Sequence, residues 1–209
     1  MFGSVVLVYL NVSSQESQRA IWRDTESGWW WLRGVSRMLA CRERKALLKL
    51  KGVEGVPEIV ESSRYAFLRT YIQGVPLHKS NRLTEDFFSN LKKILRVIHA
   101  NGVCHNDLAK EPNILVSTEG KPVIVDFQLA SCFRFKGSFV KIMQREDFRH
   151  ILKHQVKYFP KSLTESEHRA LKRKSWIALF WMWTVKPLYI LITRKILGWK
   201  DREGAGDRF

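Results

Sequence analysis

The chain has 209 residues and a formal net charge of +16, with hydrophobic residues at 45% and charged residues at 27%. This balance excludes an intrinsically disordered chain and provides enough apolar side chains for one domain, or for one domain with two lobes. The excess of positive charge predicts a phosphate-bearing partner such as a nucleotide, a nucleic acid or an anionic lipid surface.

The first part of the chain predicts a small β-rich region with one helix. β-branched and aromatic residues in VVLVYLNV and RAIWRD predict two strands. No basic residue precedes the first apolar run and no cleavage site follows it, so we interpret this run as a strand and not as a signal peptide. Helical spacing of apolar residues predicts a helix from Leu32 to Lys51. The segment GVEGVPEIVES predicts turns, and RYAFLRTYI predicts a further strand that ends at Gly74.

The second part predicts helices around one hairpin. LTEDFFSNLKKILRVIHANGV predicts a helix with Thr84 as its N-cap and Gly102 near its end. NILVS, the turn at Glu119-Gly120 and KPVIVDFQLAS predict two strands of a β-hairpin. After Ser131 the pattern becomes helical again, first in QREDFRHILKHQVKYF and then in LTESEHRALKRK and the residues after it.

The positive charge is concentrated in the C-terminal third. Residues 133–209 carry 18 Lys and Arg against 7 Asp and Glu, whereas residues 1–132 carry 18 against 13. Cysteines stand only at positions 41, 104 and 132, with the spacing neither of a disulfide framework nor of a zinc site. We therefore expect unreactive core cysteines and a reducing, cytoplasmic compartment.

Four polar residues flank the predicted hairpin: His105, Asp107, Asn113 and Asp126. Because a hairpin returns on itself, Asn113 and Asp126 should lie at the same end of it, so that two carboxylates and one amide face one small volume. Magnesium takes hard oxygen ligands, usually carboxylates together with phosphate oxygens. A second carboxylate can orient and deprotonate an acceptor hydroxyl. The set therefore fits the chemistry of a magnesium–nucleotide complex.

The same residues resemble motifs of the protein-kinase-like superfamily. HNDLAKEPN is similar to the H-R-D-L-x-x-x-N catalytic loop, and VDFQ is similar to the D-F-G metal loop. The resemblance implies that ATP and Mg²⁺ are cofactors. It implies that Asp107 is the catalytic base, that His105 braces the loop, and that Lys110 contacts the transferred phosphate. It also implies that Asn113 and Asp126 hold Mg²⁺.

The resemblance extends upstream to the residues expected to bind the nucleotide. Glu43 stands where the family has its helix glutamate, and Arg23 in AIWRD takes the place of the strand lysine that pairs with it. FLRTYIQGVPL resembles the hinge between the lobes and implies that Arg69, Tyr71 and Ile72 lie near the adenine. Arginine keeps the charge of lysine but is bulkier and forked, so its contacts with phosphates would differ.

Several departures from the common pattern point to a compact branch. The chain has no GxGxxG loop, Asn106 and Gln128 replace the usual arginine and glycine, and the spacing from Asp107 to Asn113 is one residue longer. In these respects the chain resembles RIO-type atypical kinases and bacterial lipopolysaccharide (Kdo) kinases. The resemblance implies a single α+β, two-lobed, protein-kinase-like domain, with a reduced β-rich N-lobe at about 1–72 and a mostly helical C-lobe at 73–209.

A long apolar run from Trp176 to Ile192 follows the basic segment KRK. Lys186 and Pro187 inside the run disfavour a single membrane-spanning helix, because a buried lysine is costly and proline interrupts the helix. A core helix and an interfacial helix both remain open. Tryptophans and flanking cations suit the headgroup region, so the chain is expected to be peripheral at the cytoplasmic face of an anionic membrane if the run is interfacial.

Three functions follow from these patterns. The first is an ATP- and Mg-dependent phosphotransferase that acts on a hydroxyl of a protein (Ser/Thr) or of a sugar or lipid acceptor. The second is a catalytically idle, kinase-like nucleotide-binding module, which the missing glycine loop and strand lysine favour. The third is a basic, non-enzymatic membrane-associated protein. Nucleic acid is the least favoured partner, because the sequence carries no nucleic-acid-binding signature.

Overall fold

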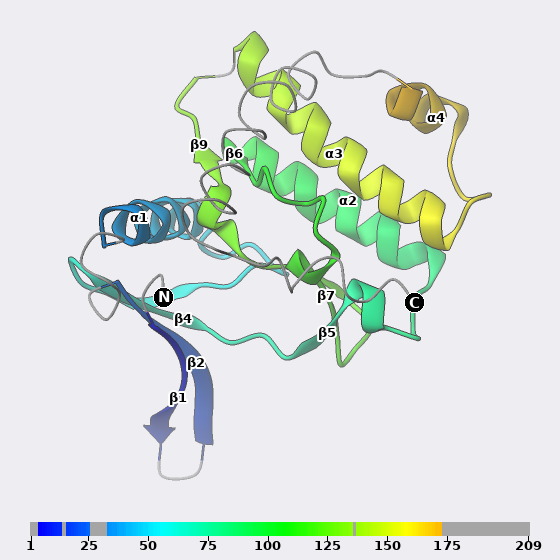
Figure 1. The fold of residues 1–209 in the computed structure, drawn as a ribbon. Helices are drawn as coiled ribbons and strands as arrows, with labels where there is room; N and C mark the ends of the chain where they lie inside the picture. The colour runs from blue at the N-terminus through cyan, green and yellow to red at the C-terminus, as the bar shows by residue number, and fades with distance from the viewer. Residues whose placement is uncertain (1–3, 14–15, 26–32, 136, 173–209) are drawn as a thin grey trace, which may run out of the picture. The chain divides into compact units, whose positions relative to one another are not determined.

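The computed structural model describes residues 4–13, 16–25, 33–135 and 137–172 (Figure 1). These residues belong to two compact units, Met1–Ser162 and Leu163–Phe209. All the sheets described below and every expected site residue lie in the first unit, and α4 (Glu165–Lys172) lies in the second. In the described part of the chain no helix is long and apolar enough to cross a membrane. The predicted apolar helix at 176–192 lies outside the described residues.

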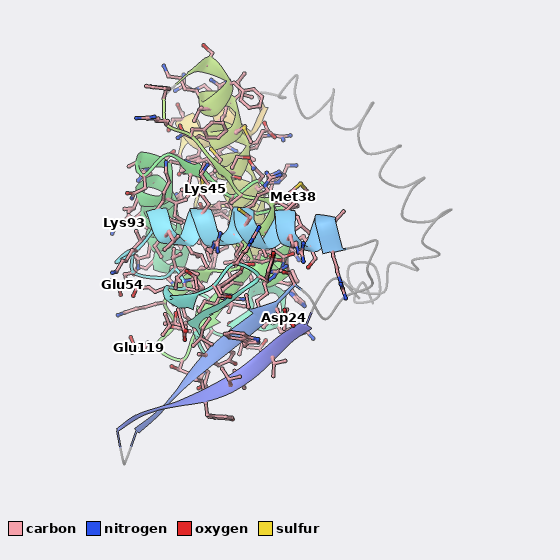
Figure 2. The ribbon with its side chains drawn as sticks, turned by 90° about the vertical axis from the view of Figure 1, so that its left-hand side faces the viewer. Asp24, Met38, Lys45, Glu54, Lys93 and Glu119 are labelled. Carbon is pink, nitrogen blue, oxygen red and sulfur yellow. The ribbon has the colours of Figure 1, made fainter. Side chains whose placement is uncertain are left out.

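The N-terminal part is an antiparallel sheet accompanied by one helix. Its strands β1 (Ser4–Ser13), β2 (Glu16–Asp24), β3 (Ile59–Ser62) and β4 (Ala66–Thr70) are arranged in the order β1-β2-β4-β3. Figure 2 shows α1 (Arg33–Lys49) side-on above the β1–β2 ribbon. The residues that α1 buries recur at helical spacing: Ser36, Ala40, Glu43, Ala46 and Leu47.

The predicted strands and helix of this part are confirmed, with one correction. The segment that predicts turns contains β3, whose β-branched residues pair with β4 through an irregularity between Ile59 and Glu61. Gly52, Gly55 and Pro57 directly before it gave the turn signal, but the pairing with β4 determines the conformation of the residues that follow.

The helical part is built around α2 (Glu85–Ala100) and α3 (Ser138–Tyr158) (Figure 1). One face of α2 is fully buried through Phe87, Phe88, Leu91, Leu95 and Ile98. Thr84 precedes α2 as predicted, but its carbonyl oxygen and not its side chain accepts a hydrogen bond, from the Phe87 N–H. Gly102 follows the helix with φ +70°, and a Cβ there would lie 2.7 Å from the Phe133 carbonyl oxygen.

Two small sheets position the polar loops. β5 (Gly74–Pro76), β7 (Ile114–Ser117) and β8 (Pro122–Ile124) form one, and β6 (Val103–Cys104) pairs with β9 (Ser131–Cys132) in the other. Short 3-10 turns complete the fold: η1 (Leu77–Lys79), η2 (Glu111–Asn113) and η3 (Phe127–Leu129). The hairpin is confirmed, since Ile114 is paired with Ile124. Its second strand is shorter than predicted, because Asp126 adopts φ +65° and ends the extended conformation.

The change from the first sheet to the second falls between Thr70 and Gly74. This position is close to the predicted end of the N-terminal part near residue 72. The assignment of residues 73–209 to one lobe stays a prediction.

Phe88 joins α2 to the end of α3, where its ring contacts those of Tyr158 and Phe159. We expect Phe88→Ala to lower the free energy of unfolding by about 3–5 kcal/mol, because it removes a buried ring and leaves a cavity. Urea denaturation measures the change. Val97→Ala on the exposed side of the same helix is the control, and it should cost well under about 1 kcal/mol.

Candidate active site

Two of the expected catalytic residues, Asp107 and Lys110, meet one of the expected metal ligands, Asn113, at the Asp107 carboxylate. The side-chain amide of Asn113 donates to the Asp107 backbone carbonyl at 2.9 Å and to its Oδ2 at 3.0 Å. The Lys110 ammonium lies 3.0 Å from the same Oδ2. Asn113 is buried, whereas Lys110 is exposed. Both nitrogen–hydrogen bonds of Asn113 thus point at Asp107, which leaves the amide oxygen Oδ1 as an acceptor for another group.

His105 ties this loop to the segment that leads to Asp126. Its ring is fully buried, and Nε2 donates to the Val125 carbonyl oxygen at 2.9 Å. The ring also packs edge-on against Phe127, with centroids 4.7 Å apart. His105 therefore has the contacts that a residue bracing the two polar loops needs.

Asp126 comes to Asn113 across the hairpin, as the sequence predicts. The Val125 N–H donates to the Asn113 carbonyl oxygen at 2.9 Å, and Asp126 follows directly. Its Oδ1 atom is buried and accepts no hydrogen bond from the described residues. A buried carboxylate oxygen without a donor is costly unless a cation or another donor reaches it. Its φ of +65° is uncommon for a residue other than glycine.

The oxygen donors of Asp126 and Asn113 fit a magnesium ion. Both offer hard oxygen atoms, and Mg²⁺ is usually bound by one or two carboxylates together with phosphate oxygens. The unpartnered Oδ1 of Asp126 is the observation that supports this assignment. The predicted metal ligands are therefore chemically suitable and lie at one end of one hairpin.

Glu43 forms a buried charged cluster with two arginines. Arg23 Nη1 lies 2.5 Å from Glu43 Oε2, and Arg69 Nε lies 3.2 Å from Glu43 Oε1. Burial raises the pKa of the Glu43 carboxyl above its ordinary value, and the two guanidinium groups act against this rise. The Asp126 charge also acts on both Glu43 and Arg69. The predicted partnership of Arg23 and Glu43 is thus present in the structure, with a second arginine added to it.

Arg69 differs in placement from the two other residues expected near the adenine. Its side chain is directed at Glu43, because Arg69 on β4 is paired with Ile21, two residues before Arg23 on β2. Tyr71 and Ile72 lie in the connection between β4 and β5 and are half-buried. The Tyr71 N–H donates to the Arg19 carbonyl oxygen at 3.2 Å. The structure therefore places Arg69 in the charged cluster, and the adenine role remains a prediction for Tyr71 and Ile72.

Asp147 on α3 is a residue of this site that the sequence analysis missed. Its Oδ2 accepts the His105 N–H at 2.7 Å, and its Oδ1 accepts the Asn106 N–H at 2.8 Å. The side chain is buried at 1% exposure. One carboxylate thus holds two consecutive backbone amides of the catalytic loop, at a point where Asn106 has φ +66°. The signal was present in the sequence, because Asp147 falls four residues before Ile151 on the buried face of a helix.

His99, Cys104 and Asp147 also lie together, with possible ligand atoms within 4.8 Å of one another. His99 Nε2 is 3.2 Å from Asp147 Oδ2, and the backbone amides already occupy both carboxylate oxygens. Burial, with a smaller contribution from the Asp147 charge, raises the pKa of the Cys104 thiol to about 12. We interpret this group as structural support for the loop, with Cys104 as a protonated core residue.

Arg42 and Asn106 hold the segment after Asp126 from two sides, and neither contact was predicted. The Asn106 amide donates to the Leu129 carbonyl oxygen at 2.8 Å and to Ser131 Oγ at 3.0 Å. Arg42 Nη2 donates to the same two acceptors at 2.9 and 3.1 Å. Because Arg42 precedes Glu43 directly, the helix that carries the charged cluster is fastened to the catalytic loop through this segment.

Comparison with known proteins tests the fold that these elements form. No protein-family model and no curated protein matches the chain. A solved structure of the Rio2 kinase–ADP/Mg²⁺–phosphoaspartate complex from Chaetomium thermophilum is similar, with a TM-score of 0.57 and 16% identity over 81% of this chain. A second Rio2 kinase structure from the same organism gives 0.56 and 17% over 81%.

The chain has a protein-kinase-like fold of the RIO type. The predicted fold class is thereby confirmed, whereas the bacterial lipopolysaccharide-kinase branch stays a prediction. The chain spans 57% and 60% of the length of the two Rio2 kinase chains. At this level of identity the likeness concerns the fold, so the activity has to be argued from the side chains.

We expect Asp147→Asn to lower the free energy of unfolding by about 3 kcal/mol. The substitution preserves volume but sets an amide NH₂ against one of the two backbone N–H donors that the carboxylate now satisfies. Urea denaturation gives the magnitude. Glu146→Gln, which weakens the ion pair to Arg149 and leaves the catalytic loop's backbone bonds in place, is the neighbouring control. Equal losses in the two variants would show that Asp147 has no special part in holding the loop.

Proposed function

We propose that the chain is an ATP- and Mg²⁺-dependent phosphotransferase that transfers the γ-phosphate to a hydroxyl group of a protein (Ser/Thr) or of a sugar or lipid acceptor. The observation that carries the proposal is that Asn113 is bonded both to Asp107 and to Val125, the residue before Asp126, whose buried Oδ1 has no donor among the described residues. The RIO-type fold supports it, and one similar Rio2 kinase structure contains ADP and Mg²⁺.

The proposed reaction is an in-line displacement at the γ-phosphorus. The acceptor hydroxyl oxygen forms a bond to phosphorus, the bond from phosphorus to the oxygen that bridges to the β-phosphate breaks, and ADP leaves. Asp107 orients the hydroxyl group and takes its proton. Lys110 lies within reach of Asp107 and supplies positive charge where the phosphoryl group passes. Asn113 and Asp126 would hold Mg²⁺, which supplies neutralisation of the phosphate charge.

We propose that the nucleotide is bound by the charged cluster of Arg23, Glu43 and Arg69 and by the connection after β4. Arg23 is the cation offered to the α- and β-phosphates, and Glu43 with Arg69 fixes its position. Tyr71 and Ile72 are the residues proposed to line the adenine. We place the protein in the cytoplasm, with peripheral association at the cytoplasmic face of the membrane.

A second function, a nucleotide-binding module without catalysis, is favoured by the cluster itself. Arg23 is buried and forms an ion pair with Glu43, so part of its positive charge is already neutralised within the protein. A protein of this kind binds nucleotide but releases no ADP. Turnover and binding have therefore to be measured separately.

ADP release with Mg-ATP tests the phosphotransferase. We expect Asp107→Ala and Asp126→Ala each to lower the rate by at least about 100-fold, because the first removes the base and the second a metal ligand. Glu119→Ala, at the exposed turn of the same hairpin (Figure 2), should leave the rate unchanged. Treatment of the phosphorylated product with hydroxylamine distinguishes a phosphate on an aspartate of the chain from a phosphate on a hydroxyl group. Release that is equal in all four proteins would refute the assigned base and metal ligand.

Nucleotide binding by titration calorimetry separates the two functions. We expect Arg23→Met to weaken ATP binding roughly 10- to 100-fold, the value of one hydrogen bond from a charged group. Asp107→Ala should bind ATP as the parent does. Arg44→Met on α1 loses only a bond to the Ser63 carbonyl oxygen and serves as the control. Binding by the parent without any turnover would support the idle module.

A further inference from the structure

One surface of the first unit combines exposed cations with exposed large apolar side chains. Its members are Met38, Lys45 and Lys49 on α1, and Arg134, Phe135 and Phe139 in and after the segment that follows β9. We call it the α1–β9 surface. Phe135 is 79% exposed and Phe139 is 56% exposed. Exposed apolar residues are ordinary when single, but a group of them among cations marks an interaction site.

The two parts of the surface meet at Lys49 and Phe133. Met38, Lys45 and Lys49 recur at helical spacing, and Figure 2 shows Met38 and Lys45 on the side of α1 that faces away from the β1–β2 ribbon. The Lys49 ammonium donates to the Phe133 carbonyl oxygen at 2.8 Å. The Phe133 ring in turn contacts the Phe139 ring, with centroids 6.2 Å apart.

The cations of this surface have no acidic partner among the described residues. Lys45 and Arg134 form no ion pair there, and Lys49 is bonded only to a carbonyl oxygen. By contrast, two exposed lysines elsewhere in the first unit have acidic partners, since Lys110 pairs with Asp107 and Lys157 pairs with Glu111. Unpaired like charges on one side of a helix repel each other, so the surface is complementary to an anionic partner.

A hollow lies within the surface. Lys49, Phe133, Arg134 and Phe135 line an open pocket of about 230 Å³ together with the end of α2 and residues 140 and 144. Two cations and two aromatic rings at one pocket suit a group that is anionic at one end and apolar at the other. A phospholipid has this chemistry, with a phosphate headgroup that joins apolar chains.

We propose that the α1–β9 surface docks the protein on an anionic lipid bilayer. Lys45, Lys49 and Arg134 attract the headgroups, and Met38, Phe135 and Phe139 insert at the boundary between headgroups and acyl chains. The surface is distinct from the apolar run at 176–192, which lies outside the described residues. A folded, positively charged and partly aromatic face can therefore supply membrane attachment.

The position of the surface indicates which class of hydroxyl acceptor the protein would phosphorylate, an inference that rests on the proposed function. The segment that carries Arg134 and Phe135 begins at Leu129 and Ser131, which the Asn106 amide holds. Asn106 is the neighbour of Asp107, the proposed base. The α1–β9 surface is thus joined to the catalytic loop by a short hydrogen-bonded segment, and on this ground we favour a lipid-linked acceptor.

Co-sedimentation of the full chain with lipid vesicles, without ATP, tests the docking. One set of vesicles is phosphatidylcholine with about 30% of the anionic lipid phosphatidylglycerol, and the other set is phosphatidylcholine alone. We expect the parent to bind the anionic vesicles only and to dissociate at about 0.5 M salt. Lys45→Gln/Lys49→Gln and Phe135→Ser/Phe139→Ser should each lower the partition coefficient about tenfold. Lys92→Gln/Lys93→Gln on α2 removes two lysine charges and Tyr9→Ser on β1 removes one exposed aromatic ring, both outside the α1–β9 surface. These control variants should bind as the parent does.

Three outcomes would overturn the proposal. Equal binding by the parent and both surface variants would assign attachment to another part of the chain. Absence of binding to anionic vesicles at low salt would exclude docking altogether. Tighter binding of a single-stranded oligonucleotide, unaffected by Phe135→Ser/Phe139→Ser, would make the surface a nucleic-acid site. Because vesicle binding is measured without nucleotide and Asp107→Ala should bind vesicles normally, failure here is distinguishable from failure of the phosphotransferase.

Discussion

The catalytic loop depends on one buried carboxylate. Asp147 accepts hydrogen bonds from the backbone N–H groups of both His105 and Asn106. Among the described residues these two N–H groups have no backbone carbonyl oxygen of a helix or strand as their acceptor. Without this acceptor one buried and one partly buried donor would lose their hydrogen bonds, and the positive φ of Asn106 would lose the contact that stabilises it. The direction of the Asp107 side chain follows from this backbone conformation. The geometry of the loop thus depends on a residue that lies 42 positions after His105 and 41 after Asn106.

The nucleotide side depends on a charge balance of a different kind. Glu43 is buried between Arg23 and Arg69, so each charge is tolerable only in the presence of the others. A single lysine in place of Arg23 would provide one compact charge and no fork. Two arginines instead pair with the two carboxylate oxygens, so that the neighbouring strands β2 and β4 are both joined to α1 through Glu43. The cluster therefore stabilises the sheet–helix arrangement as well as presenting a cation.

Local patterns predicted much of the site, and distant contacts explain what they missed. The hairpin, its turn and the approach of Asp126 to Asn113 follow from residues within a span of about a dozen positions, so strand periodicity and turn chemistry were sufficient. Asp147 and Arg42 act on residues about 40 and 90 positions away, and the sequence offers no local sign of their targets. Arg69 was placed by its proximity to the hinge, whereas strand register decides where its side chain points. β3 was missed because pairing with β4 overrides the turn-forming residues before it.

The Leu129 carbonyl oxygen is shared by two donors, Arg42 from α1 and Asn106 from the catalytic loop. If either donor moves, it changes the hydrogen bonding of the same carbonyl oxygen and, through Ser131, of the same short strand β9. In the proposed function, α1 would position the cation offered to the nucleotide and the loop would orient the base. The shared acceptor therefore couples these two proposed tasks through one short segment of the chain.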